Sequence, residues 1–102
     1  MTKIINGKKY DTRTATAVGE WSNGRSSRDF SYCTETLYRK RTGEYFLYGE
    51  GGPSSRYSQR VDQNSWMGGD RIIPLMVNDA KKWAEEKLSV DDYEKEFGEV
   101  DE

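Results

Sequence analysis

The sequence contains no histidine and a single cysteine, Cys33. Histidine is the commonest general base and the usual activator of a serine or cysteine nucleophile, so its absence removes the most frequent catalytic arrangements. A lone cysteine forms neither an internal disulfide nor a zinc site built from cysteines. The composition therefore predicts a protein that is not an enzyme and that uses no metal and no cofactor.

Hydrophobic residues are also scarce, at 33% of the 102 residues, although aromatic residues make up 13%. Aromatic side chains bury large areas, so we expect one folded domain with a thin core rather than a disordered chain. Small secreted domains usually carry disulfides, which favours a reducing cytoplasm for this chain. Residues 1–7 are too polar for a signal peptide, and no apolar run approaches the roughly 20 residues of a membrane span.

Charge is distributed unevenly along the chain. Residues 1–61 carry a net charge of +5 and residues 62–102 a net charge of −7, for a total of −2. A basic body followed by an acidic end is typical of interaction proteins, although an acidic helix that only aids solubility has the same pattern.

The N-terminal half predicts strands around one helix. Asn6-Gly7 is the strongest short signal for a hairpin turn. Residues 13–21 carry apolar side chains at helical spacing, which predicts an N-terminal helix. Residues 30–40 and 45–48 alternate aromatic or β-branched residues with others, so they predict a second hairpin with Cys33 as a small core residue.

The C-terminal half predicts an irregular segment, a short strand and two helices. Residues 49–69 are expected to be irregular, and their glycine-rich start lacks the Lys-Ser/Thr ending of a phosphate-binding loop. Pro74 places the strand at residues 71–75 at a sheet edge. A helix over residues 77–88 follows, with Asn78 rather than Met76 as its expected cap. Ser89 and Asp92 form the capping box of a last helix.

These elements predict an α+β fold. We expect a small antiparallel sheet built from two hairpins plus a short last strand, with one N-terminal helix and two C-terminal helices packed on it. The chain is one domain, residues 1–102, with a body at 1–88 and an acidic C-terminal helix and tail at 89–102.

Two interaction surfaces are predicted from the charge pattern. Carboxylates along the last helix can imitate a row of phosphates and occupy a basic channel of a protein that handles nucleic acid. The residues expected to contact such a partner are Asp91, Asp92, Glu94, Glu96 and Glu99. The alternative is a nucleic-acid-binding module that uses a basic, tyrosine-rich sheet, although the pI of 5.3 is far below the value of about 9 usual for such domains. Its expected contacts are Arg25, Arg39, Arg41, Arg56, Tyr38 and Tyr48.

Three stretches also resemble a family of small proteins from phages and mobile elements of Gram-positive bacteria. The stretches are Lys3-Ile4-Ile5-Asn6-Gly7-Lys8-Lys9-Tyr10-Asp11-Thr12, Gly49-Glu50-Gly51-Gly52-Pro53, and Ile73-Pro74-Leu75 followed by Ala80, Trp83, Ala84 and Glu85. Small mobile-element proteins of this kind include anti-CRISPR inhibitors. The resemblance implies a non-catalytic inhibitor that binds a protein or ribonucleoprotein complex in the cytoplasm of a bacterial host and makes no membrane contact.

Overall fold

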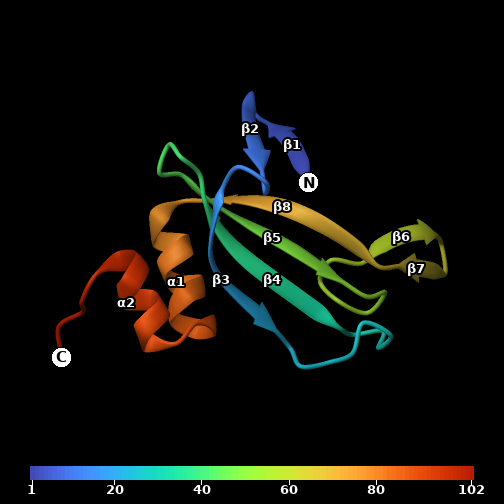
Figure 1. Ribbon diagram of the computed structural model, residues 1–102. Coiled ribbons are helices and arrows are strands. Elements are labelled where there is room, and N and C mark those ends of the chain that lie inside the picture. The colour runs from blue at the N-terminus through green and yellow to red at the C-terminus, as the bar shows by residue number, and fades with distance from the viewer.

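The computed structural model describes all 102 residues and is built around a four-stranded antiparallel sheet with strand order β3-β4-β5-β8 (Figure 1). Two small hairpins, β1–β2 and β6–β7, extend from this sheet, and two helices close the chain. The strands are β1 (Thr2–Ile5), β2 (Lys8–Asp11), β3 (Thr16–Ser22), β4 (Cys33–Arg39), β5 (Tyr45–Gly51), β6 (Gln59–Asp62), β7 (Ser65–Met67) and β8 (Gly69–Leu75); the helices are α1 (Val77–Lys87) and α2 (Val90–Phe97).

The first hairpin forms at the Asn6-Gly7 turn, as the sequence predicts. The expectation that it builds the main sheet is wrong, because β1 and β2 form a separate two-stranded sheet. Both turn residues have positive φ, 52° at Asn6 and 77° at Gly7. Asparagine and glycine tolerate this left-handed conformation better than other residues, so the turn fixes the register of β1 against β2.

The expected N-terminal helix is absent, and the prediction was wrong. Residues 16–22 instead form β3, an edge strand paired antiparallel with β4. A β-bulge between Ala17 and Gly19 inserts an extra residue into the strand. The bulge brings Val18 and Trp21, three positions apart, onto the same side of the sheet, where both pack against the helices. A strand with a bulge can therefore mimic the i, i+3 spacing of a helix.

The segment expected to be irregular is also more ordered than the sequence predicts. β5 continues as far as Gly51, and residues 59–67 form the β6–β7 hairpin. The prediction for β8 is confirmed, because this strand lies at the sheet edge with Pro74 opposite Phe46.

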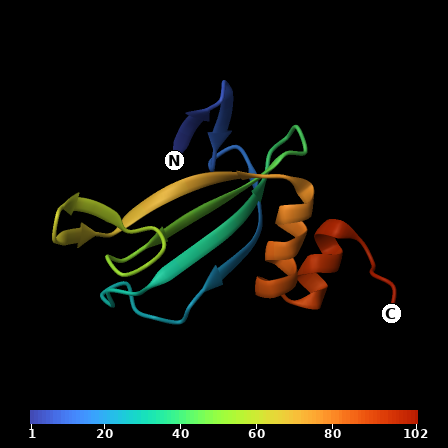
Figure 2. The ribbon, with the colours of Figure 1, turned by 180° about the vertical axis from the view of Figure 1, so that it is seen from behind.

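The two helices cover one face of the sheet (Figures 1 and 2). Ala80, Trp83 and Ala84 of α1 are buried against Leu37 and Leu47 of the central strands. Full burial of a leucine such as Leu37 contributes about 2 kcal/mol. These contacts hold α1 on the sheet and give α2 a surface on which to dock.

The helix starts differ in how they are capped. Helix α1 spans Val77–Lys87, in agreement with the helix predicted over residues 77–88. The cap expected at Asn78 is wrong, because the N-cap residue is Met76, which makes no side-chain cap bond. Helix α2 begins after Ser89, whose hydroxyl accepts a hydrogen bond from the amide of Asp92, as predicted.

The opposite face of the sheet is covered only at one end. Tyr10 of the first hairpin packs edge-on against Phe46, beside the buried Ile72. The remaining part of this face, which we call the open sheet face, carries hydroxyl and carboxyl side chains: Glu20, Ser22, Thr34, Thr36, Tyr38, Tyr48, Glu50 and Asp70.

Candidate functional site

The last helix docks through Tyr93 and Phe97, whose rings lie 5.0 Å apart, and Phe97 also contacts the ring of Tyr45 at 5.6 Å. This docking determines which way each predicted carboxylate points. Because the aromatic side of α2 faces the sheet and α1, the acidic residues are distributed around its remaining surface rather than along one stripe.

Glu96 points inward and is not available to a partner. Its carboxylate accepts hydrogen bonds from the guanidinium of Arg39 and, at 2.6 Å, from the hydroxyl of Tyr45. Only 10% of the Glu96 side chain is exposed. Burial and the neighbouring Glu96 carboxylate raise the pKa of Tyr45 to about 12. The Arg39–Glu96 pair therefore fixes α2 to the end of β4 and serves the fold.

The other four predicted carboxylates lie on different sides of the C-terminal segment. Asp92 lies with Lys95 on the side that faces β3, whereas Glu94 lies on the side that faces α1 and the tail. Asp91 and Glu99 are exposed at the two ends of α2. The five residues therefore do not form one acidic face.

The chain after α2 folds back and creates a groove. Gly98 adopts a φ of 90° and turns the chain, and the amide of Val100 donates a hydrogen bond to Glu94 at 3.2 Å. The resulting C-terminal groove has a volume of about 370 Å³. Its apolar lining residues are Ala84, Leu88, Val90, Tyr93 and Val100, and its polar ones are Glu85, Ser89, Glu94, Asp101 and Glu102.

The groove combines an apolar floor with four carboxylates and contains no lysine or arginine. Glu94 alone belongs to the predicted contact residues; Glu85, Asp101 and Glu102 were not among them. Glu94 lies four positions after Val90, so helical periodicity could have placed it on the same side. The position of Glu85 depends on how α1 meets α2, which no local pattern in the sequence indicates.

The residues predicted for nucleic-acid binding do not converge on one surface. Arg39 is bound by Glu96, Arg56 lies 3.1 Å from Glu35, and Arg25 lies 3.4 Å from Asp29. Arg41 is exposed in the turn between β4 and β5. Two of the four arginines are therefore held by carboxylates that are themselves buried or nearly so.

The two tyrosines of that prediction lie on the open sheet face, which is acidic. The ring of Tyr38 stacks on Phe46, and the hydroxyl of Tyr48 donates toward Glu50 at 3.2 Å and Asp70 at 3.4 Å. Glu50 and Asp70 are directly opposite in the β5–β8 register, and neither has a basic partner. Carboxylates repel phosphates, so this surface does not favour nucleic acid.

A buried polar cluster lies under α1, around Glu35 of β4. The Glu35 carboxylate, 2% exposed, accepts hydrogen bonds from the Tyr57 hydroxyl, the Arg56 guanidinium at 3.1 Å and the Trp83 indole at 3.0 Å. A Cβ atom on Gly49, the cross-strand neighbour of Glu35, would lie 1.9 Å from the Tyr57 ring. The cluster joins the 52–58 loop and α1 to the sheet, and no buried side-chain polar atom in it lacks a hydrogen-bond partner.

Cys33 is a buried, unpaired core residue, in agreement with the sequence prediction. Burial and the nearby Glu35 carboxylate raise the pKa of its thiol, which disfavours the reactive thiolate. No set of three or more histidine, cysteine, aspartate or glutamate side chains is placed to hold a metal ion. Neither helix is long and apolar enough to cross a membrane.

Comparison with protein-family models, curated proteins and solved structures finds no match to this chain.

Proposed function

We propose that the chain is a non-catalytic binding protein whose C-terminal groove holds a positively charged, amphipathic segment of a partner protein. The observation that carries this proposal is the chemistry of the groove, an apolar floor beside four carboxylates with no basic residue. Apolar side chains of a partner gain from burial on such a floor, while lysine or arginine beside them pairs with the carboxylates.

In its more specific form, the proposal is an inhibitor from a phage or mobile element that acts in the cytoplasm of a bacterial host. Its partner would be a nucleic-acid-targeting complex of the CRISPR effector type, which presents a basic channel. The acidic C-terminal region supports this form, because carboxylates compete with phosphates for a basic surface. The resemblance of residues 3–12 to mobile-element proteins points in the same direction.

The contact residues in this proposal differ from those expected from the sequence. Glu96 is no longer among the contact residues, because its carboxylate accepts hydrogen bonds from Arg39 and Tyr45. The contacts are instead the groove carboxylates Glu85, Glu94, Asp101 and Glu102. Asp91 and Glu99 are exposed at the ends of α2, and Asp92 lies on the side that faces β3.

A peptide titration tests whether the groove binds a basic segment. The probe is a fluorescently labelled amphipathic helix of lysine and leucine, compared with a peptide of the same composition without amphipathic periodicity. We expect tighter binding of the amphipathic probe, weakened by salt. The triple variant Glu85→Lys, Glu94→Lys, Asp101→Lys should lose at least tenfold in affinity.

The matched control is Glu20→Lys, Glu50→Lys, Asp70→Lys, which makes the same change in net charge on the open sheet face. It should retain more of the affinity than the groove variant. Equal losses in both variants would mean that only net charge matters, and the groove would not be a binding site.

A second experiment tests the inhibitor proposal. Purified CRISPR effector complexes from Gram-positive bacteria are assayed for target-DNA binding with increasing amounts of the chain. We expect loss of DNA binding at stoichiometric amounts, relieved by the groove triple variant. Unchanged DNA binding by every effector would refute this specific form, whatever the outcome of the peptide titration.

A further inference from the structure

The β6–β7 hairpin carries large apolar side chains that the rest of the molecule leaves about half exposed. All residues of both strands are exposed, including Val61 at 58%, Trp66 at 54% and Met67 at 47%. The two strands pair only with each other. A two-stranded hairpin that exposes a tryptophan is marginally stable by itself, so a contact that buries Trp66 would be favourable.

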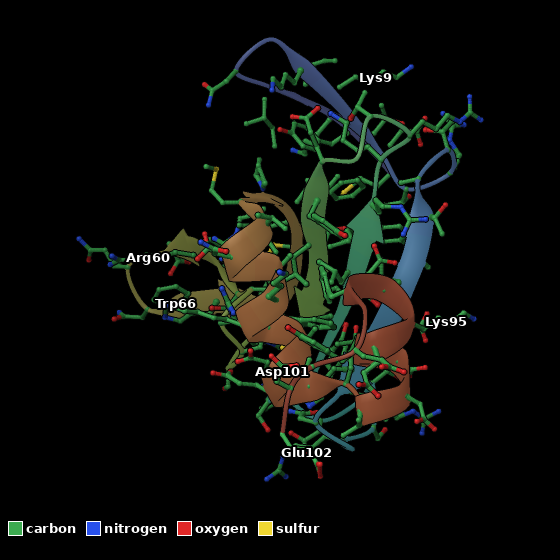
Figure 3. All side chains as sticks on the ribbon, turned by 90° about the vertical axis from the view of Figure 1, so that its left-hand side faces the viewer. Lys9, Arg60, Trp66, Lys95, Asp101 and Glu102 are labelled. Atoms are coloured by element: carbon green, nitrogen blue, oxygen red, sulfur yellow. The ribbon has the colours of Figure 1, made fainter.

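The tip of this hairpin is nevertheless preorganised. Arg60 donates from Nε to the Asp62 carbonyl at 3.0 Å and from Nη2 to the Gln63 carbonyl at 3.1 Å, and its guanidinium lies 6.0 Å from the centre of the Trp66 ring. The Asn64 amide donates to the Asp62 carboxylate at 2.9 Å and closes the turn. Figure 3 shows Arg60 and Trp66 projecting away from the body. Tryptophan and arginine held in this way are typical of interface anchors.

The hairpin and the C-terminal groove lie at opposite ends of the molecule (Figures 1 and 2), whose longest dimension is 48 Å. The groove offers what the hairpin lacks, an apolar floor formed by Leu88, Val90 and Tyr93 beside carboxylates. The hairpin offers what the groove lacks, an indole beside a guanidinium. One copy of the chain cannot bring its own two ends together, but two copies can.

We infer that the chain associates with itself head to tail, with the β6–β7 hairpin of one copy seated in the C-terminal groove of the next. Trp66 lies on the apolar floor, and Arg60, its cross-strand neighbour on the same face of the hairpin, pairs with the groove carboxylates. The contact joins two different surfaces, so it leaves one hairpin and one groove free in every assembly that does not close into a ring. This inference rests on the groove of the proposed function. The hairpin of a second copy and a partner protein would compete for that same groove.

Sedimentation velocity on the full chain tests the inference, over a concentration series up to about 1 mM, where contacts of millimolar affinity are detectable. The wild-type chain should sediment faster as concentration rises. Trp66→Ala, which keeps the groove, and the double variant Glu85→Lys, Glu94→Lys, which keeps the hairpin, should each remain monomeric. Ile4→Ala, which truncates another exposed side chain, is the matched control and should behave as the wild type.

Mixing the two monomeric variants gives the decisive result. Each supplies the surface that the other lacks, so an equimolar mixture should form a heterodimer and nothing larger. A monomeric wild type at every concentration, or a mixture that stays monomeric, would overturn the inference.

Trp66→Ala could prevent association simply by unfolding the hairpin, and a charge swap distinguishes that effect from the loss of a contact. Arg60→Glu alone should abolish association, and combining it with Glu85→Lys and Glu94→Lys in one chain should restore it. Association that Arg60→Glu leaves unchanged would overturn the inference in the same way.

The amphipathic lysine-leucine peptide separates this inference from the proposed function. Trp66→Ala leaves the groove intact, so it should bind the peptide at least as tightly as the wild type does. If the wild type binds the peptide but does not self-associate, the self-association is overturned and the proposed function stands. If the wild type does neither, the groove is not a binding site and both proposals are overturned.

Discussion

Arg39 at the end of β4 and Glu96 in the last turn of α2 are 57 positions apart in the chain and form a two-oxygen contact, with Nη1 donating to both carboxylate oxygens. The Tyr45 hydroxyl donates to the same carboxylate. Glu96 therefore differs from the acidic residues around it, because its charge is used within the fold.

Replacing Glu96 should therefore lower the free energy of unfolding, whereas replacing the exposed acidic residues around it should not. Glu96→Ala leaves the Tyr45 hydroxyl and the Arg39 guanidinium without their shared acceptor, and we expect the free energy of unfolding to fall by about 2 kcal/mol. Glu99→Ala, an exposed control from the same segment, should change it by less than about 0.5 kcal/mol. Urea denaturation followed by circular dichroism measures both. Equal effects would contradict the structural role of Glu96.

The buried carboxylate of Glu35 predicts a larger effect. Glu35→Ala removes the acceptor of the Tyr57 hydroxyl and the Trp83 indole, both in buried positions, and leaves two donors unsatisfied. We expect a loss of about 3 kcal/mol in the free energy of unfolding. Tyr57→Phe removes one donor and retains the carboxylate's other partners, so its loss should be smaller, about 1 kcal/mol. A Glu35→Ala variant as stable as the wild type would show that the cluster contributes nothing.

Much of this arrangement was predictable from local sequence signals, and the failures have physical causes. Asn6-Gly7, Ser89 and Pro74 determine a turn, a helix cap and a sheet edge through properties of single residues. The N-terminal helix was predicted wrongly because the bulge after Ala17 gives a strand the apolar spacing of a helix.

In the site as well, features that depend on local sequence were predictable, whereas contacts between distant segments were not. Glu96 lies three positions after the inward-facing Tyr93, so helical periodicity already brings it toward the sheet. Its pairing with Arg39 joins segments far apart in sequence, as does the groove between α1, α2 and the tail. Contacts of this kind depend on tertiary packing, which single-residue signals do not report.

Acid should destabilise the chain through two carboxylates near the first hairpin. Hydrogen bonds from the Arg13 side chain and amide lower the pKa of Asp11 from 3.8 to about 2. Hydrogen bonds from Lys8 and Thr42 lower the pKa of Glu44 from 4.5 to about 2. A carboxyl whose pKa is depressed by folding stabilises the folded state above its unfolded pKa and loses that contribution as pH falls.

Thermal unfolding measured between pH 7 and pH 2 checks this expectation. The melting temperature should fall between about pH 4.5 and pH 2, the interval between the unfolded and folded pKa values. Glu44→Gln should have a shallower fall, because its amide does not titrate. A wild-type profile that matches that of Glu44→Gln would show that the Lys8–Glu44 contact does not contribute.

The uncapped start of α1 provides a stabilising substitution. Met76 is the N-cap residue, is 75% exposed and makes no cap hydrogen bond, while its backbone is already extended with φ −72° and ψ 157°. A serine in this conformation can accept a hydrogen bond from the amide of Asn78 or Asp79, as Ser89 does from Asp92 in α2. Met76→Ser should therefore raise the free energy of unfolding by about 1 kcal/mol relative to Met76→Ala, which removes the same side chain without supplying an acceptor. Equal denaturation midpoints for the serine and alanine variants would mean that the free amides at this helix start are satisfied by water.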